Sequence, residues 1–157
     1  MSKKVIIIDD SALMRRVISD IIESDDRFIV VSTAANGLDA LDQIVKEPKR
    51  FDLAILDINM PKMNGIEFLE QIEKLNLALK VIVVSTVAKE GAKETIRCLE
   101  LGAFDFVTKP ESFIEAKGDV FRQRIIQKLC VASGYEEEKK RIHETVSAEE
   151  NIKRETV

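Results

Sequence analysis

The fold is decided by the stretch VIIIDDS at residues 5–11, in which four apolar residues are followed directly by two acids and a serine. A continuous apolar run of this length is typical of a parallel strand that is buried on both faces. Further runs rich in Val and Ile predict strands at residues 28–33, 53–56, 81–84 and, more weakly, 104–107. The stretch therefore predicts the first strand of a parallel sheet, with polar residues placed at the strand end.

The segments between these runs have apolar residues at the spacing of amphipathic helices. The expected apolar faces are Leu13, Val17 and Ile21 with Met14, Ile18 and Ile22; Leu38, Leu41 and Val45; Ile66, Leu69, Ile72 and Leu75; Ala92, Ile96 and Leu99; and Phe121, Ile125 and Leu129. Regular alternation of strands and helices predicts an α/β fold of the (βα)5 type, a doubly wound parallel sheet with helices on both faces. Flavodoxin-like sheets of this kind have the strand order 2-1-3-4-5, and they bind ligands at the carboxyl ends of their strands.

Composition excludes several classes of function. The 157 residues include 24 Lys and Arg against 28 Asp and Glu, which gives a net charge of −4, and there is no Trp. A mildly acidic chain with few aromatic residues is a poor nucleic-acid binder. No apolar run is long enough for a signal peptide or a membrane span. Cys98 and Cys130 form no CxxC pair and His143 is the only histidine, so neither a zinc site nor a redox pair is indicated. We therefore expect a cytoplasmic protein that binds neither nucleic acid nor membrane.

Polar residues follow four of the predicted strands. These residues are Asp9 and Asp10, then Asp57, then Ser85, and finally Lys109. With the strand order 2-1-3-4-5 they converge on one edge of the sheet. Clustered carboxylates repel one another unless a cation neutralises them, and a site with only oxygen ligands favours Mg²⁺, with Mn²⁺ as the alternative. Asp57 is then a candidate nucleophile toward a phosphoryl group, with Lys109 as a positive charge for a phosphoryl oxygen.

At these residues the sequence resembles the receiver domain of two-component response regulators, the CheY-like family. The matching motifs are VIIIDDS at 5–11, DINMP at 57–61 with MNG at 63–65, VVS at 83–85, GA at 102–103 and TKP at 108–110. They occur in the family's order and spacing, and the likeness covers roughly residues 3–131. Each motif alone is a weak signal, whereas the set together is specific.

The resemblance implies a phosphoacceptor and a metal site. Asp57 would take a phosphoryl group from a histidine kinase. Asp10 would bind Mg²⁺ directly, Asp9 would assist, and the backbone carbonyl of Asn59 would complete the set together with Asp57. Asp10 or Ser11 also suits the N-cap of the first helix, a role that is compatible with metal binding.

The resemblance also implies a switch. Ser85 would be the switch hydroxyl and Phe106 the switch aromatic, while Lys109 would contact the phosphoryl group. The Lys109–Pro110 peptide bond would be cis. A downstream protein partner would bind the face made by the fourth helix, the fifth strand and the fifth helix, and a homodimer is an open alternative. Phe104 is expected in the core.

Two motifs suggest a subfamily. DSALMRR at 10–16 and ELGAFDFVTKP at 100–110 resemble the receiver of the chemotaxis methylesterase CheB. Asn59 departs from the glutamate common there, and no Ser, His and Asp set of an esterase is visible. We therefore expect either a chemotaxis-type switch that is not itself an enzyme, or the regulatory domain of a CheB-like protein-glutamate methylesterase without its catalytic domain. A haloacid-dehalogenase-type phosphatase is a weaker alternative, because that family needs Asp-x-Asp after its first strand.

The composition changes near the end of the chain. Residues 136–141 form a charge block, EEEKKR, and the rest is polar. We expect a receiver domain at residues 1–131, followed at residues 132–157 by a charged tail or linker, part of which has helical spacing.

Overall fold

The computed structural model describes residues 2–86 and 89–135, and its sheet has five parallel strands in the order β2-β1-β3-β4-β5. The strands are β1 (Lys3–Ile8), β2 (Phe28–Ala34), β3 (Leu53–Asp57), β4 (Lys80–Ser85) and β5 (Asp105–Thr108). The predicted strand order and the doubly wound α/β architecture are confirmed. The fifth strand begins one residue later than expected.

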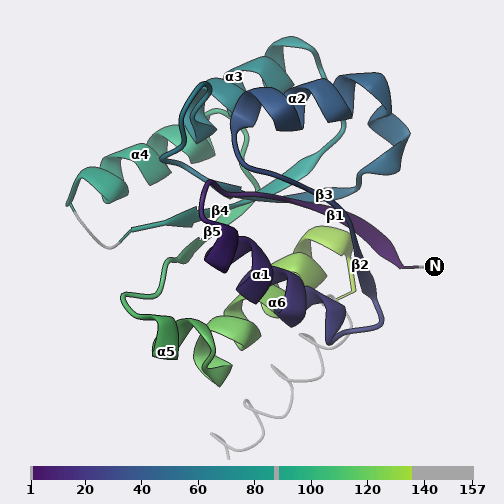
Figure 1. Ribbon diagram of the computed structural model, residues 1–157. Helices are drawn as coiled ribbons and strands as arrows, with labels where there is room; N and C mark the ends of the chain where they lie inside the picture. Colours follow the sequence, from purple (N-terminus) through teal and green to yellow (C-terminus); the bar gives the residue numbers. More distant parts are fainter. Residues whose placement is uncertain (1, 87–88, 136–157) are drawn as a thin grey trace, which may run out of the picture.

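Residues 2–86 and 89–135 form six helices and one 3₁₀ turn, of which α5 and α6 follow the last strand and the others lie between strands. They are α1 (Ala12–Glu23), α2 (Gly37–Lys46), η1 (Pro48–Arg50), α3 (Gly65–Lys74), α4 (Lys89–Glu100), α5 (Phe113–Ala116) and α6 (Asp119–Ser133). Figure 1 shows the sheet between two helical layers, with α2, α3 and α4 on one side and α1, α5 and α6 on the other. The five long helices match the predicted segments, whereas η1 and the single turn α5 have no apolar periodicity and were not predicted.

Both faces of the sheet are buried, as the continuous apolar runs require. In β1, Val5 and Ile7 pack toward α1 and α6, while Ile6 and Ile8 pack toward α2 and α3. All four of these side chains are fully buried. The carboxyl ends of β1, β2 and β3 are aligned, because Ile8 at the end of β1 pairs with Leu56 on β3 and with Ala34 on β2.

Helix α2 presents a different face to the core than its apolar spacing predicted. The buried residues are Gly37, Ala40 and Ile44, whereas Leu38 and Val45 are each 52% exposed. The reason is close packing, because the Gly37 N–H donates to the Met63 carbonyl at 2.9 Å and a Cβ at position 37 would lie 2.6 Å from that oxygen. Small residues therefore determine the orientation of α2, and the larger apolar side chains are left outside.

Helix α4 and Phe104, the residue before β5, also differ from the predicted burial. Cys98 and Thr95 are buried on α4, while the expected core residue Ile96 is 58% exposed. The Thr95 hydroxyl donates to the Gly91 carbonyl at 2.7 Å, so it is satisfied within the helix and tolerates burial. Phe104, also expected in the core, is 39% exposed, and its ring lies 5.5 Å from the Lys80 ammonium.

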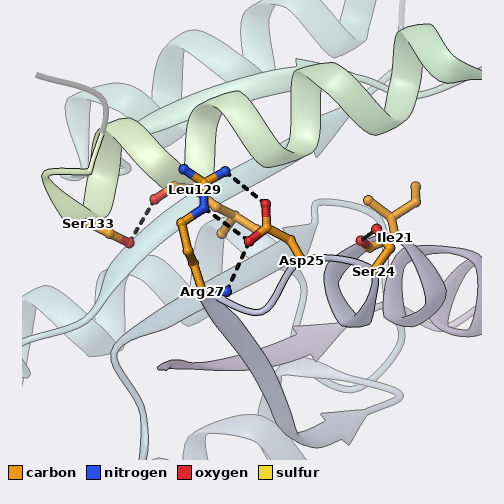
Figure 2. A network of polar contacts seen from close by, with 6 residues as sticks. All are labelled: Ile21, Ser24, Asp25, Arg27, Leu129 and Ser133. Atoms are coloured by element: carbon orange, nitrogen blue, oxygen red, sulfur yellow. Dashed lines mark hydrogen bonds and ion pairs between the residues drawn. The ribbon is translucent and has the colours of Figure 1, made fainter. Parts of the chain in front are cut away.

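The end of α6 is anchored on the turn between α1 and β2 (Figure 2). The Arg27 guanidinium donates two hydrogen bonds to the Asp25 carboxylate, at 3.0 and 2.8 Å, and lies 5.9 Å from the rings of Phe28 and Tyr135. Those two rings meet edge to face at 6.0 Å. The helix thus continues through Ser133 as an integral part of the α1 layer, and the rest of the predicted tail, residues 136–157, lies outside the described residues.

Two further sequence predictions concern the cysteines and membrane-spanning segments. Cys98 and Cys130 are both buried, and burial raises the pKa of the Cys98 thiol to about 11. Within residues 2–86 and 89–135, no helix combines the length and the apolar character that a bilayer span demands.

The orientation of α2 can be tested with two neighbouring residues, Ile44 at 1% exposure and Val45 at 52%. Ile44→Ala should lower the free energy of unfolding by about 2–5 kcal/mol, because it opens a cavity in the core. Val45→Ala should change it by less than about 0.5 kcal/mol, because the Val45 side chain is half exposed and lies outside the core. Urea denaturation of both variants measures the difference, and a larger loss for Val45→Ala would contradict the observed orientation.

Candidate functional site

The candidate site lies at the carboxyl edge of the sheet, where four neighbouring strands end. Asp9 follows β1, Asp57 is the last residue of β3, Ser85 is the last residue of β4, and Lys109 follows β5. Since β1 pairs with β3, β3 with β4 and β4 with β5, these residues lie on adjacent strands. The convergence that the sequence predicted is therefore present in the structure.

Three carboxylates form a compact cluster at this edge. Asp9, Asp10 and Asp57 each offer one carboxylate oxygen, and the three oxygens lie within 4.8 Å of one another. Asp9 is 1% exposed and Asp57 is 5% exposed, whereas Asp10 is exposed to solvent. Two of the acids are thus removed from the water that would otherwise screen their repulsion.

Asp9 is held through three of its polar groups. Its N–H donates to the Ala34 carbonyl at 3.0 Å, its Oδ1 accepts from the Ser11 N–H at 2.8 Å, and its carbonyl accepts from Arg15 Nη1 at 2.7 Å. Its Oδ2 is the one buried side-chain oxygen or nitrogen in the described part of the chain without a hydrogen-bond partner. The side chain is therefore fixed, with one oxygen left for a ligand.

The environment of Asp57 disfavours its ionised form. Burial, above all, and the neighbouring Asp9 raise the pKa of Asp57 to about 7, although Lys109 and a hydrogen bond from the Asn59 N–H act in the opposite direction. Burial also raises the pKa of Asp9. Lys109 Nζ lies 3.8 Å from Asp57 Oδ1 and 4.0 Å from Asp9 Oδ2, which is too far for a hydrogen bond to either. One ammonium at this distance compensates the acids only in part.

These residues fit a hard divalent cation. The donor set consists of carboxylate oxygens alone, which suits Mg²⁺ or Mn²⁺ and not a softer metal. The buried Oδ2 of Asp9 has no partner within the chain, so a cation beside it would satisfy an oxygen that is otherwise costly to bury. Asn59 is exposed and lies two residues after Asp57, in the loop that follows β3.

Ser85 and Lys109 are joined through the backbone. Ser85 is buried, and its carbonyl accepts from the Lys109 N–H at 2.6 Å, which extends the pairing of β4 with β5 past Thr108. The Lys109–Pro110 bond is trans, since no peptide bond among residues 2–86 and 89–135 is cis. The expected cis bond is therefore wrong for this structure, which has the isomer favoured by about 0.5–1 kcal/mol for bonds preceding proline.

The loop after Asp57 depends on Gly65, the glycine of the MNG motif. Asn64 caps α3 by accepting from the Glu67 N–H, and the Glu67 side chain accepts from the Asn64 N–H in return. Gly65 then donates its N–H to the Ile58 carbonyl at 2.8 Å. A Cβ at position 65 would lie 2.7 Å from the Asp57 carbonyl oxygen, so only glycine lets α3 start this close to the candidate acceptor.

Phe106 lies on β5, away from the acid cluster. Its side chain is 40% exposed, and its N–H donates to the Asp105 carboxylate at 2.7 Å, which also pairs with Lys128 at 2.9 Å. A hollow of about 350 Å³ beside it is lined by residues of β5 and α6. The predicted switch aromatic is therefore a surface residue in this structure, connected to the site through β5.

Sequence comparison identifies curated relatives of this chain. A protein-glutamate methylesterase/protein-glutamine glutaminase from Clostridium acetobutylicum is 45% identical over 130 residues, which make up 82% of this chain and 36% of that protein. The match covers between 26% and 36% of the length of this relative and of two others with the same description.

Solved structures with the same fold include chemotaxis proteins. The response regulator domain of Thermotoga maritima CheB has a TM-score of 0.70 and 38% identity, covering 86% of this chain and 96% of that one. A chain of the CheX-CheY-BeF3-Mg²⁺ complex from Borrelia burgdorferi has a TM-score of 0.69 and 30% identity, covering 82% and 87%.

The family match supports both receiver hypotheses, the chemotaxis-type switch and the regulatory domain of a methylesterase, over the phosphatase hypothesis. Residues 5–118 match the family described as the response regulator receiver domain. This match decides against a haloacid-dehalogenase-type phosphatase, since it covers most of the chain and includes the strand ends that carry Asp9, Asp57 and Lys109. The chain belongs to the response regulator receiver domain family.

Proposed function

We propose that Asp57 accepts a phosphoryl group from a histidine kinase and that the phosphorylated chain changes its affinity for a protein partner. The observation that carries the proposal is the buried Asp57 carboxylate, clustered with Asp9 and Asp10 and 3.8 Å from the Lys109 ammonium. A nucleophilic carboxylate, a divalent-cation site and a positive charge are the elements that phosphoryl transfer to an aspartate needs.

Each residue has a distinct task in the proposed transfer. An oxygen of Asp57 attacks the phosphorus of a phosphohistidine, the P–N bond breaks as the O–P bond forms, and the histidine leaves on the kinase. Lys109 neutralises one oxygen of the transferred group, and the Ser85 hydroxyl donates a hydrogen bond to another. Asp9, Asp10, Asp57 and the carbonyl of Asn59 would hold Mg²⁺ or Mn²⁺, which supplies further neutralisation of negative charge.

The proposed output face is made by α4, β5 and α6. It carries large apolar side chains that are exposed in this structure, namely Ile96, Leu99, Phe104 and Phe106. Lys109 connects this face to the site, because it directly follows β5 and its N–H donates to the Ser85 carbonyl. A new dianion on Asp57 would draw Lys109 and Ser85 toward it and change the burial of Phe106, which shifts the population between two states.

A second candidate function is regulation of a methylesterase. It is favoured by the names of the relatives, which are methylesterases of which this chain matches about a third, and by the CheB response regulator domain among the solved structures. On this proposal the receiver, predicted at residues 1–131, extends to the end of α6 at Ser133, and the residues after this helix link it to a catalytic domain. The neighbouring genes and the full reading frame distinguish this candidate from a chemotaxis switch that acts in the cytoplasm as a monomer or homodimer.

The ionisation of Asp57 makes the stability of the cation-free protein depend on pH. The folded state keeps a proton on Asp57 up to about pH 7, whereas the unfolded chain releases it near pH 3.8. The stability gained from this proton is complete below pH 3.8 and is lost as the pH rises through about 7.

We therefore expect Asp57→Asn to stabilise the cation-free protein at pH 8, by up to about 4 kcal/mol, because it removes a buried charge beside Asp9. The variant should also lose less stability than the wild type between pH 4 and pH 8. Urea denaturation in EDTA measures both effects. A variant that is less stable than the wild type at pH 8 would contradict the assigned environment of Asp57.

Beryllofluoride with Mg²⁺ tests the acceptor itself, because it mimics a phosphoryl group on an aspartate. We expect it to shift the amide resonances of Ser85 and Phe106 in the wild type and to leave them unchanged in Asp57→Asn. Asp42→Asn is the matched control, since Asp42 is exposed on α2 and pairs only with Lys46 among the described residues. An Asp57→Asn variant that responds like the wild type would exclude Asp57 as the acceptor.

Lys109→Ala separates acceptance from switching. The acid cluster remains, so we expect the variant to retain phosphorylation by a small phosphodonor, but with amide shifts at Phe106 at least about threefold smaller than in the wild type. Lys117→Ala serves as control, because Lys117 is exposed and its ammonium lies over the Phe113 ring, away from the cluster. Shifts of wild-type size at Phe106 in Lys109→Ala would refute the switch role of Lys109.

A further inference from the structure

Helix α1 carries two consecutive arginines in different environments. Arg16 lies on the solvent side, where its Nε is 3.4 Å from Asp20 Oδ2 and the two side chains are 80% and 70% exposed. Arg15 is partly buried, and its Nη1 donates to the Asp9 carbonyl at 2.7 Å. Only the first arginine of the pair therefore contacts the loop that carries the acids.

Arg15 connects both ends of this loop. The loop has three residues, Asp9, Asp10 and Ser11, between the last residue of β1 and the first of α1. The Arg15 N–H donates to the Ser11 carbonyl at 3.0 Å, while the Arg15 guanidinium donates to the Asp9 carbonyl. The Ser11 side chain also accepts from the Met14 N–H, and the Ser11 N–H donates to Asp9 Oδ1. The loop is thus tied to the first turn of α1 at its start and at its end.

The geometry points to Arg15 as a positioning residue for the cation site, because its side chain fixes the loop so that Asp9 Oδ2 and Asp10 face Asp57. This inference rests on the proposed function, since it assumes that the cluster binds a divalent cation. Residues that orient metal ligands without touching the metal commonly change metal affinity by about 10–100-fold when they are replaced. Arg15 Nη1 donates to the Asp9 backbone carbonyl, so Arg15 would act on a cation through the loop and is not a catalytic residue.

The charge of Arg15 and its hydrogen bond have opposite effects on cation binding. A guanidinium near three carboxylates repels a divalent cation, so loss of the charge alone would tighten binding. Loss of the hydrogen bond would free the Asp9 carbonyl and loosen the loop, which weakens binding. The sign of the change in affinity therefore distinguishes the two roles.

The experiment measures the dissociation constant of MgCl₂ for the full chain by isothermal titration calorimetry, with urea denaturation in EDTA to confirm folding. We expect Arg15→Met to bind Mg²⁺ about 10-fold more weakly than the wild type. Arg15→Lys keeps the charge but has a single donor group on a shorter, non-planar side chain, and we expect a loss of about threefold. Arg16→Met should bind like the wild type. In cation-free spectra, the amide resonances of Asp10 and Ser11 should shift in Arg15→Met and stay in place in Arg16→Met.

The possible outcomes separate this inference from the proposed function. Equal or tighter Mg²⁺ binding by Arg15→Met overturns the positioning role, as does an equal loss in Arg16→Met. If Arg15→Met does not fold, wild-type affinity in Arg15→Lys overturns it instead. Failure of the wild type to bind Mg²⁺ overturns the proposed function, whatever the variants do.

Discussion

The burial of two clustered carboxylates at the edge of the sheet is the constraint that the surrounding structure has to satisfy. Asp9 and Asp57 are almost completely buried beside Asp10, and the Lys109 ammonium stands 3.8–4.0 Å away without forming a hydrogen bond to either buried acid. Such a cluster is costly in the cation-free chain, and the cost appears in the raised pKa values of both buried acids. An added positive charge therefore stabilises this site. Its charge balance changes again when a phosphoryl dianion is added to Asp57.

The fold holds this unfavourable arrangement in place from several directions. The strand order brings the ends of β1, β3 and β4 together, Arg15 and Ser11 tie down the loop after β1, and Gly65 allows α3 to start against the backbone of Asp57. Fully buried apolar residues of β1, β3 and β4 support that edge from both faces of the sheet. The connection to the surface runs from Lys109 along β5 to Phe106, which is 40% exposed, and this is the direction in which we propose that the switch acts.

The sequence predicted the features that depend on local patterns and missed those that depend on packing between distant segments. Apolar runs followed by polar residues predicted the strands and the convergence of the polar residues at one edge of the sheet. Parallel strands of a doubly wound sheet end at a common edge, so this prediction needs no knowledge of side-chain conformation. The buried faces of α2 and α4 were mispredicted, since small residues such as Gly37 set the approach of the helix while Leu38 remains outside. The contact of Arg15 with the Asp9 carbonyl depends on a side-chain conformation and on the loop path, so neither spacing nor composition could distinguish Arg15 from Arg16.

The central claim is that Asp57 is the phosphoacceptor of a cation-dependent site. It is tested most directly by incubating the chain with phosphoramidate and Mg²⁺, reducing the acyl phosphate with borohydride, and locating the modified residue by mass spectrometry of peptides. The account predicts modification at Asp57 alone, abolished by EDTA. Modification at another residue, or modification of Asp57 that is unaffected by EDTA, would contradict it.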